Sequence, residues 1–148
     1  MATNRRNFIK KTGFLATASA FSPNILLSAT KTKKEKLGVA LVGLGYYSTD
    51  LLAPALQLTK NCELKGIVTG SPHKIPKWKK LYNIKDKNIY NYQNFEQIAN
   101  NNEIDVIYIV LPPSMHSEYS IRAANTGKHV WCEKPMAPSV SECEAMIK

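Results

Sequence analysis

Apolar residues gather in several runs that have the length of buried β-strands. The runs cover residues 37–42, 62–69, 104–111 and 128–132, and a further short strand is expected at Ile89–Tyr90. The run at 104–111 is almost continuously apolar, which is typical of a parallel strand covered on both faces.

Turn and capping residues mark helices between these strands. Helices are expected at about 47–60, at 74–82, after Asn94, from the Pro112-Pro113 pair to about 126, and from 139 onward. Pro54 should kink or shorten the first of them. Asn94 and Gly127 are expected as caps, and Ser139 with Glu142 fits a capping box. Strands that alternate with helices predict an α/β fold with a doubly wound parallel sheet.

The segment Gly-Leu-Gly-Tyr-Tyr-Ser follows the first strand directly and has the spacing of a dinucleotide-binding turn. Gly43 permits the tight turn, Gly45 lets the main chain approach a pyrophosphate, and the small Ser48 lets the next helix pack closely. Tyr46 and Tyr47 either line the cofactor groove or cover the sheet edge. A plain strand–helix turn uses the same glycines, but the alternation of strands and helices favours the dinucleotide site.

Ligands of an open parallel sheet bind at the carboxyl ends of the strands, near the point where the strand order reverses. The candidate segments are therefore 43–48, 69–74, 111–116 and 132–135. Leu111 and Pro112 are expected to contact the cofactor because they follow the strongest predicted strand.

The segment after the second strand indicates which dinucleotide is bound. An NAD site usually has an acidic side chain about 20 residues after the glycines, where it binds the ribose 2′-hydroxyl. Glu63 lies at the other end of this strand, and the strand is followed by Thr69, Gly70, Ser71 and Lys74. Hydroxyls and a cation would hold a 2′-phosphate. We therefore expect NADP rather than NAD; the alternative for Lys74 is a solvated lysine at a helix start.

The net charge of +9 is concentrated near the N-terminus. Residues 1–36 contain eight of the 20 Lys and Arg residues and one of the 11 acidic residues. The rest of the chain is nearly balanced, so it lacks the basic composition of a nucleic-acid-binding domain. No nucleic-acid partner is expected.

The first 36 residues are expected to be a twin-arginine signal and a charged linker. Arg5 and Arg6 are followed by Phe8, Ile9 and Lys10. The weakly apolar stretch at 13–27 is too short and too polar for a transmembrane helix. The interpretation predicts export by the twin-arginine translocase to the periplasm; the alternative is a disordered basic N-terminus.

The three cysteines have no metal-ligand spacing, so no metal site is expected. Cys62 and Cys132 fall on predicted strands and are expected to be buried thiols. Proteins that fold before twin-arginine export do not need a disulfide framework.

With Glu133-Lys134-Pro135 after the last strand, residues 37–148 resemble the glucose–fructose oxidoreductase / inositol dehydrogenase (Gfo/Idh/MocA) family, and most closely its glucose–fructose oxidoreductase branch. The segments that carry the resemblance are Gly-Leu-Gly-Tyr-Tyr-Ser at 43–48, Gly-Ile-Val-Thr-Gly at 66–70, Ile-Tyr-Ile-Val-Leu-Pro at 107–112, Ser-Met-His at 114–116 and Gly-Lys-His-Val-Trp-Cys-Glu-Lys-Pro-Met-Ala at 127–137.

The resemblance implies a Rossmann domain in which Lys134 lies beside the nicotinamide and the reacting sugar carbon. It also implies that Glu133 and Pro135 shape the loop around Lys134, and that His116 begins a helix below the cofactor. Pro113 departs from the family pattern, which often has Asn there, so a cofactor contact from this position is in doubt. From the residues alone, Lys134 could orient a substrate hydroxyl or take its proton, or it could form a surface ion pair with Glu133.

The family continues into a second α+β domain that supplies most of the substrate pocket and the oligomer interface. The chain ends inside its last predicted helix, so we expect it to be truncated before that domain and inactive on sugars by itself. Three functions stay open: the NADP-binding part of an exported, homo-oligomeric oxidoreductase acting on a sugar or polyol, an NAD-dependent glycoside hydrolase of the same fold, and a nucleotide-binding module without chemistry.

Overall fold

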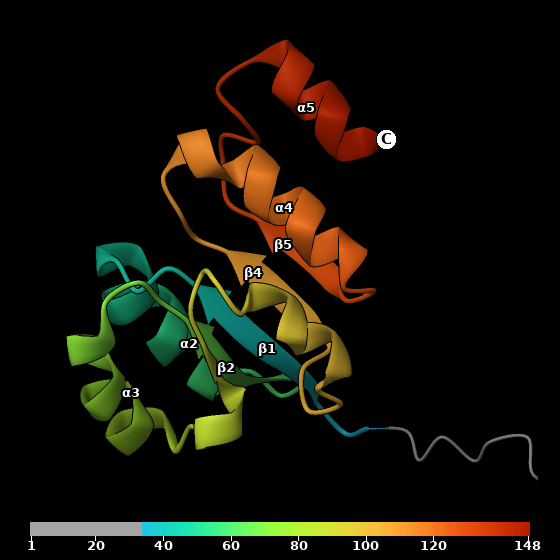
Figure 1. Ribbon diagram of the computed structural model, residues 1–148. Coiled ribbons are helices and arrows are strands. Elements are labelled where there is room, and N and C mark those ends of the chain that lie inside the picture. Colours follow the sequence, from blue (N-terminus) through green and yellow to red (C-terminus); the bar gives the residue numbers. More distant parts are fainter. Residues whose placement is uncertain (1–33) are drawn as a thin grey trace, which may run out of the picture. The chain divides into compact units, whose positions relative to one another are not determined.

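The computed structural model describes residues 34–148, which form a five-stranded sheet with helices on both faces (Figure 1). The strands are β1 (Leu37–Val42), β2 (Cys62–Val68), β3 (Ile89–Tyr90), β4 (Val106–Ile109) and β5 (His129–Cys132). Their order is β3-β2-β1-β4-β5, and every neighbouring pair is parallel. The predicted doubly wound sheet is confirmed. Residues 1–33 of the expected twin-arginine signal and linker, which were predicted at 1–36, lie outside the described residues.

Strand β4 is shorter than the apolar run at 104–111 that predicts it. Ile104 is fully buried, but its N–H donates to the carbonyl oxygen of Asn101 and belongs to a turn. At the other end Val110 still donates to Val42 before the chain turns at Pro112. The apolar run therefore reflects burial on both sides of the sheet, which extends beyond the strand ladder itself.

The helical elements follow the predicted order, with several short 3₁₀ turns among them. They are η3 (Tyr47–Leu52), α2 (Ala53–Leu58), η4 (Pro72–Lys74), α3 (Ile75–Tyr82), η5 (Asp86–Asn88), η6 (Phe95–Asn100), η7 (Pro113–Met115), α4 (His116–Asn125) and α5 (Val140–Ile147). The helix expected at 47–60 is divided: a π-helical segment reaches Leu52, and Pro54 lies in the first turn of α2. A proline is tolerated there because that N–H needs no intrahelical acceptor.

Two of the three predicted helix caps form as expected. Gly127 has a φ of +73° just after α4, and its N–H donates to the carbonyl oxygen of Ala124. The Ser139 hydroxyl oxygen accepts from the Glu142 N–H at 3.3 Å, which caps α5 as predicted. The Glu142 carboxylate accepts from the Ser139 hydroxyl at 2.6 Å rather than from the Ser139 N–H, so the return bond of the predicted capping box is replaced. These contacts define the end of α4 and the start of α5.

Asn94 stands at the predicted N-cap position of η6, but its side chain makes no capping hydrogen bond. Its side-chain oxygen accepts from the Asn91 N–H at 2.7 Å, while its own N–H donates to the Asn91 side-chain oxygen at 3.0 Å. The two asparagines thus satisfy each other in a turn. A local side-chain to main-chain bond competes with capping, and the following segment, η6, is a 3₁₀ helix.

The cysteines are less buried than expected. Cys62 and Cys132 are free thiols of intermediate exposure. Cys62 begins β2, and Cys132 ends the edge strand β5, which pairs with β4 on one side. A position at a strand end or on an edge is covered less completely than one in a central strand.

The sheet separates two apolar layers. Val39 and Leu41 of β1 pack with Leu56 and Trp78 on the face covered by α2 and α3. The alternate residues of β1, Ala40 and Val42, join a cluster with η6 and α4 on the other face (Figure 1). This alternation follows from the two-residue period of a strand. Both faces of β1 are therefore closed, and the carboxyl edge of the sheet remains for ligands.

The segment just before β1 contacts the sheet. The Lys34 ammonium lies 2.6 Å from the Asp105 carboxylate, which also accepts from the Gly38 N–H at 2.8 Å. This arrangement joins the start of β1 to the start of β4. Within residues 34–148, no helix combines the length and apolar character that crossing a bilayer requires.

Candidate dinucleotide-binding site

The glycine turn lies at the point where the strand order reverses. From β1 the chain passes outward to β2 and β3, then crosses back to β4 on the other side of β1. The carboxyl ends of β1 and β4 are therefore neighbours, and Val110 donates from the end of β4 to Val42 at 2.9 Å. This is where doubly wound sheets bind ligands.

Gly43 is required by the turn itself. Its φ is +93°, and a Cβ atom there would lie 2.5 Å from the Val110 carbonyl oxygen. Its N–H donates to the Val68 carbonyl oxygen at 2.9 Å. The residue thus joins β1, β2 and β4 at a place that has no room for a side chain.

Gly45 and Ser48 have different surroundings. A Cβ atom on Gly45 would meet nothing within 4 Å, so the space beside this residue is open. Ser48 is fully buried, and its hydroxyl donates to the Gly43 carbonyl oxygen at 2.6 Å. Ser48 therefore holds the helix start against the turn, while Gly45 leaves the approach to the main chain free.

A hollow of about 270 Å³ lies beside this turn. Its lining comes from the turn, η3, η4 and α3: Leu44, Gly45, Tyr46, Thr49, Asp50, Lys74, Lys77 and Trp78. The Lys74 ammonium donates to the Leu44 carbonyl oxygen at 2.7 Å. Three predicted site residues, Gly45, Tyr46 and Lys74, are thus brought together. Sequence reasoning missed Lys77; its place one helical turn after Lys74 was the available signal.

The other predicted site residues after β2, namely Thr69, Gly70 and Ser71, do not line this hollow. Thr69 is buried, and its hydroxyl oxygen accepts from the Ser71 N–H at 3.0 Å. Gly70 lies under the Tyr92 ring, because a Cβ atom there would come within 2.8 Å of the ring. The structure thus shows Thr69 shaping the turn that presents Ser71. Tyr92, which the sequence analysis did not select, closes over Gly70.

His116 links the two loops that follow β4 and β5. It is 1 % exposed at the start of α4, as the resemblance implies. Its Nε2 lies 2.7 Å from the Leu111 carbonyl oxygen, and its Nδ1 lies 2.8 Å from the Pro135 carbonyl oxygen. Leu111 is half-buried, and Pro112 is exposed beside it.

The carboxylate of Glu133 is held on both oxygens. The Tyr108 hydroxyl of β4 donates to one oxygen, and the Lys134 N–H donates to the other at 3.2 Å. Burial, reinforced by the Glu133 carboxylate, raises the pKa of Tyr108 well above its usual value of 10. Sequence reasoning missed Tyr108, although a hydroxyl inside an apolar strand signals a buried hydrogen bond.

The side chain of Lys134 is exposed, and within residues 34–148 its ammonium forms no ion pair. The surface ion pair with Glu133 that the residues alone left open is therefore not formed there. Tyr47, which is 42 % exposed, begins the helix after the glycine turn.

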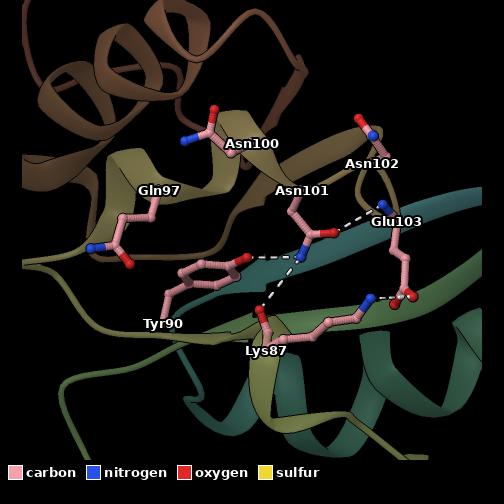
Figure 2. Close-up of a pocket in the computed structure, with 7 residues that line it drawn as sticks. All are labelled: Lys87, Tyr90, Gln97, Asn100, Asn101, Asn102 and Glu103. Carbon is pink, nitrogen blue, oxygen red and sulfur yellow. Dashed lines mark hydrogen bonds and ion pairs between the residues drawn. The ribbon is translucent and has the colours of Figure 1, made fainter.

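A second hollow, of about 520 Å³, is lined by residues of η5, β3, η6 and the turn before β4 (Figure 2), and no residue of the glycine turn borders it. Its polar groups bind one another: the Asn101 amide donates to the Tyr90 hydroxyl at 2.8 Å, and the Lys87 ammonium lies 2.7 Å from the Glu103 carboxylate. Hydrogen bonds satisfied in this way stabilise the turn between η6 and β4.

A sequence model of the Gfo/Idh/MocA oxidoreductase family, described as having an NAD-binding Rossmann fold, matches residues 37–148. The crystal structure of aldose-aldose oxidoreductase from Caulobacter crescentus, complexed with glycerol, has the same fold. The two are 42 % identical with a TM-score of 0.74, over 76 % of this chain and 33 % of that chain.

Two curated relatives agree with this match. D-xylose 1-dehydrogenase (NADP(+)) of Haloarcula marismortui is 28 % identical over 109 residues, which are 74 % of this chain and 30 % of the relative. An uncharacterized oxidoreductase of Synechocystis is 32 % identical over 111 residues, 75 % of this chain and 29 % of the relative. The chain spans about a third of the length of these relatives. It belongs to the Gfo/Idh/MocA oxidoreductase family, of which residues 37–148 form the nucleotide-binding Rossmann domain.

Proposed function

We propose that this domain binds NADP and serves an oxidoreductase that transfers hydride to or from a sugar or polyol. The observation that carries the proposal is the hollow beside the glycine turn, which is open at Gly45 and bordered by Lys74 and Lys77. A main chain that a phosphate can approach, next to two cations, suits the phosphates of a dinucleotide.

The preference for NADP rests on the charges around this hollow. Lys74 now donates to a neutral carbonyl oxygen, and a phosphate is a stronger partner for an ammonium than a carbonyl is. Glu63, the acid of β2, belongs to its amino end and pairs with Lys65 at 2.8 Å. Asp50 is the acid in the lining, and the two lysines outnumber it.

The substrate class rests on the relatives and on Lys134. The printed names of the relatives include an aldose-aldose oxidoreductase and a xylose dehydrogenase. When bound, NADP would supply a hydride acceptor or donor at its nicotinamide. In this proposal the Lys134 side chain, which has no ion-pair partner within the described residues, is free to meet the substrate hydroxyl. As the neutral amine it takes the hydroxyl proton while hydride passes from the carbon to NADP, and as the ammonium it returns that proton in the reverse direction.

Isothermal titration of the 148-residue chain with NADP and with NAD tests the cofactor. We expect NADP to bind at least about tenfold more tightly, which corresponds to about 1.4 kcal/mol. Tighter binding of NAD would contradict the NADP proposal and favour the glycoside hydrolase alternative. Failure to bind either dinucleotide would contradict the proposed function as a whole.

We also propose that the N-terminal segment directs export through the twin-arginine translocase. The support is the sequence Arg5-Arg6 followed by Phe8, Ile9 and Lys10. Replacing both arginines by lysine keeps the charge but removes the paired guanidinium groups. The chain should then stay in the cytoplasmic fraction of a bacterium with an active translocase. Equal amounts of wild type and variant in the periplasm would contradict this proposal.

A further inference from the structure

The main chain on each side of Lys134 is tied to the sheet by a different residue. Before Lys134, the Glu133 carboxylate accepts from the Tyr108 hydroxyl of β4. After Lys134, the Pro135 carbonyl oxygen lies 2.8 Å from Nδ1 of His116. Both partners come from elements that precede the loop in the sequence, so the loop is held from outside itself.

Glu133 lies between Tyr108 and Lys134 and forms a hydrogen bond with each of them. One carboxylate oxygen takes the Tyr108 hydroxyl, and the other takes the Lys134 N–H at 3.2 Å. The Glu133 N–H donates to the Ile109 carbonyl oxygen at 3.1 Å, which continues the pairing of β5 with β4. Two hydrogen bonds, one from the Lys134 N–H to Glu133 and one from the Tyr108 hydroxyl to Glu133, therefore connect the Lys134 amide to β4.

His116 connects the loop that carries Lys134 to the loop that follows β4. Its ring is 1 % exposed, with both nitrogens within 2.8 Å of carbonyl oxygens, those of Leu111 and Pro135. A neutral imidazole carries one N–H and can donate to one of them, whereas the imidazolium donates to both. With an N–H on both nitrogens the ring ties the loop after β4 to the loop after β5, whereas the neutral ring holds only one of the two carbonyl oxygens.

We propose that Tyr108 and His116 are positioning residues that set where Lys134 stands relative to cofactor and substrate. This inference rests on the proposed function of the domain. The Lys134 side chain is long and exposed, and it has no ion-pair partner among the described residues. Its placement therefore depends on its main chain. A small displacement of a reacting group greatly lowers the rate of the catalysed reaction. Residues that fix the main chain at Lys134 would therefore support hydride transfer.

The Tyr108 arm is tested by nuclear magnetic resonance on the 148-residue chain labelled with ¹⁵N-lysine. The Lys134 amide signal is assigned as the one that disappears in Lys134→Arg. In Tyr108→Phe, we expect this signal to shift and its exchange with solvent to become at least tenfold faster. Tyr119→Phe is the matched control, because Tyr119 lies on α4 and packs against Phe95 and Tyr92; it should leave the signal unchanged.

A folded Tyr108→Phe chain with an unchanged Lys134 amide would overturn the proposal. If Tyr108→Phe does not fold, Tyr108→Met gives the same test, because it also removes the hydroxyl, leaves Glu133 in place and should speed the same exchange tenfold. The His116 arm uses His116→Phe, expected to broaden or shift the Lys134 signal, and His116→Gln, whose amide can donate to a carbonyl and should restore it in part. An unchanged signal in His116→Phe overturns that arm.

A second measurement separates this inference from the proposed function. NADP should bind Tyr108→Phe with a dissociation constant within about threefold of wild type, because the glycine turn and Lys74 are intact. The NADP-induced shift of the Lys134 signal should nevertheless differ between the two chains. Wild-type chain that does not bind NADP would defeat the proposed function, yet the cofactor-free exchange would still report on Tyr108. Identical NADP-induced shifts would defeat the positioning role alone.

Discussion

The Lys74 ammonium donates to the Leu44 carbonyl oxygen at 2.7 Å, across 30 residues of sequence. The bond connects the segment after β2 to the glycine turn after β1. It brings a cation to the rim of the hollow at which a dinucleotide phosphate is expected. Both segments were predicted to bind the same dinucleotide, and the fold brings them into direct contact.

Lys74→Ala should weaken NADP binding more than NAD binding. A hydrogen bond to a charged group contributes about 1.5–3 kcal/mol, so we expect the NADP dissociation constant to rise about tenfold or more and that of NAD about threefold or less. Titration calorimetry with both dinucleotides measures this. Lys80→Ala, which removes an exposed lysine of α3 outside the hollow, is the control. Equal losses for the two dinucleotides would mean that Lys74 does not recognise the 2′-phosphate.

The two glycines of the turn should respond differently to alanine. In Gly45→Ala the methyl group enters open space, so the free energy of unfolding should change by less than about 1 kcal/mol. NADP should bind at least about tenfold more weakly, because the methyl group stands where a phosphate would approach.

Gly43→Ala should instead damage the fold. Its φ of +93° is unfavourable for alanine, and the new Cβ would lie 2.5 Å from the Val110 carbonyl oxygen. We expect a loss of more than about 2 kcal/mol in the free energy of unfolding, measured by urea denaturation. A Gly43→Ala chain as stable as wild type, or a Gly45→Ala chain with full NADP affinity, would contradict the assignment of these glycines.

Glu103 should make stability depend on pH in the acid range. Hydrogen bonds from Lys87, Asn88 and Lys85 lower the pKa of this carboxyl group from 4.5 to about 2. A lowered pKa stabilises the folded state above the unfolded value, and that contribution is lost as the pH falls from about 4.5 to about 2. Glu103→Gln should therefore flatten the decline of the melting temperature over this interval. A variant with the same acid profile as wild type would show that Glu103 does not contribute.

Tyr108 should stay protonated in strongly alkaline solution. Burial and the Glu133 carboxylate raise its pKa well above 10, so its ionisation should be missing from the native chain up to about pH 11. Titration of the tyrosine absorbance near 295 nm tests this by comparison with Tyr108→Phe. The two chains should show the same absorbance change up to pH 11. A smaller change in the variant would mean that Tyr108 ionises normally and lacks its partner.

Local sequence chemistry predicted much of the framework. The apolar runs predicted where the strands lie along the chain, and Gly127 and Ser139 mark helix boundaries as expected, because a left-handed turn and a capping hydroxyl act over a few residues. Asn94 occupies its expected N-cap position, but its side chain does not cap the helix, because the nearby Asn91 offers it a competing partner.

The sequence by itself determined the alternation of strands and helices, the glycine turn and the family, since each depends on residues adjacent in the chain. Only the tertiary structure decided which residues meet. The Tyr108–Glu133 contact and the link from His116 to Pro135 join positions far apart in sequence. Side-chain direction across a sheet depends on register and on the packing of both faces. No local pattern encodes that register, so the partners that hold Lys134 in place became visible only in the folded chain.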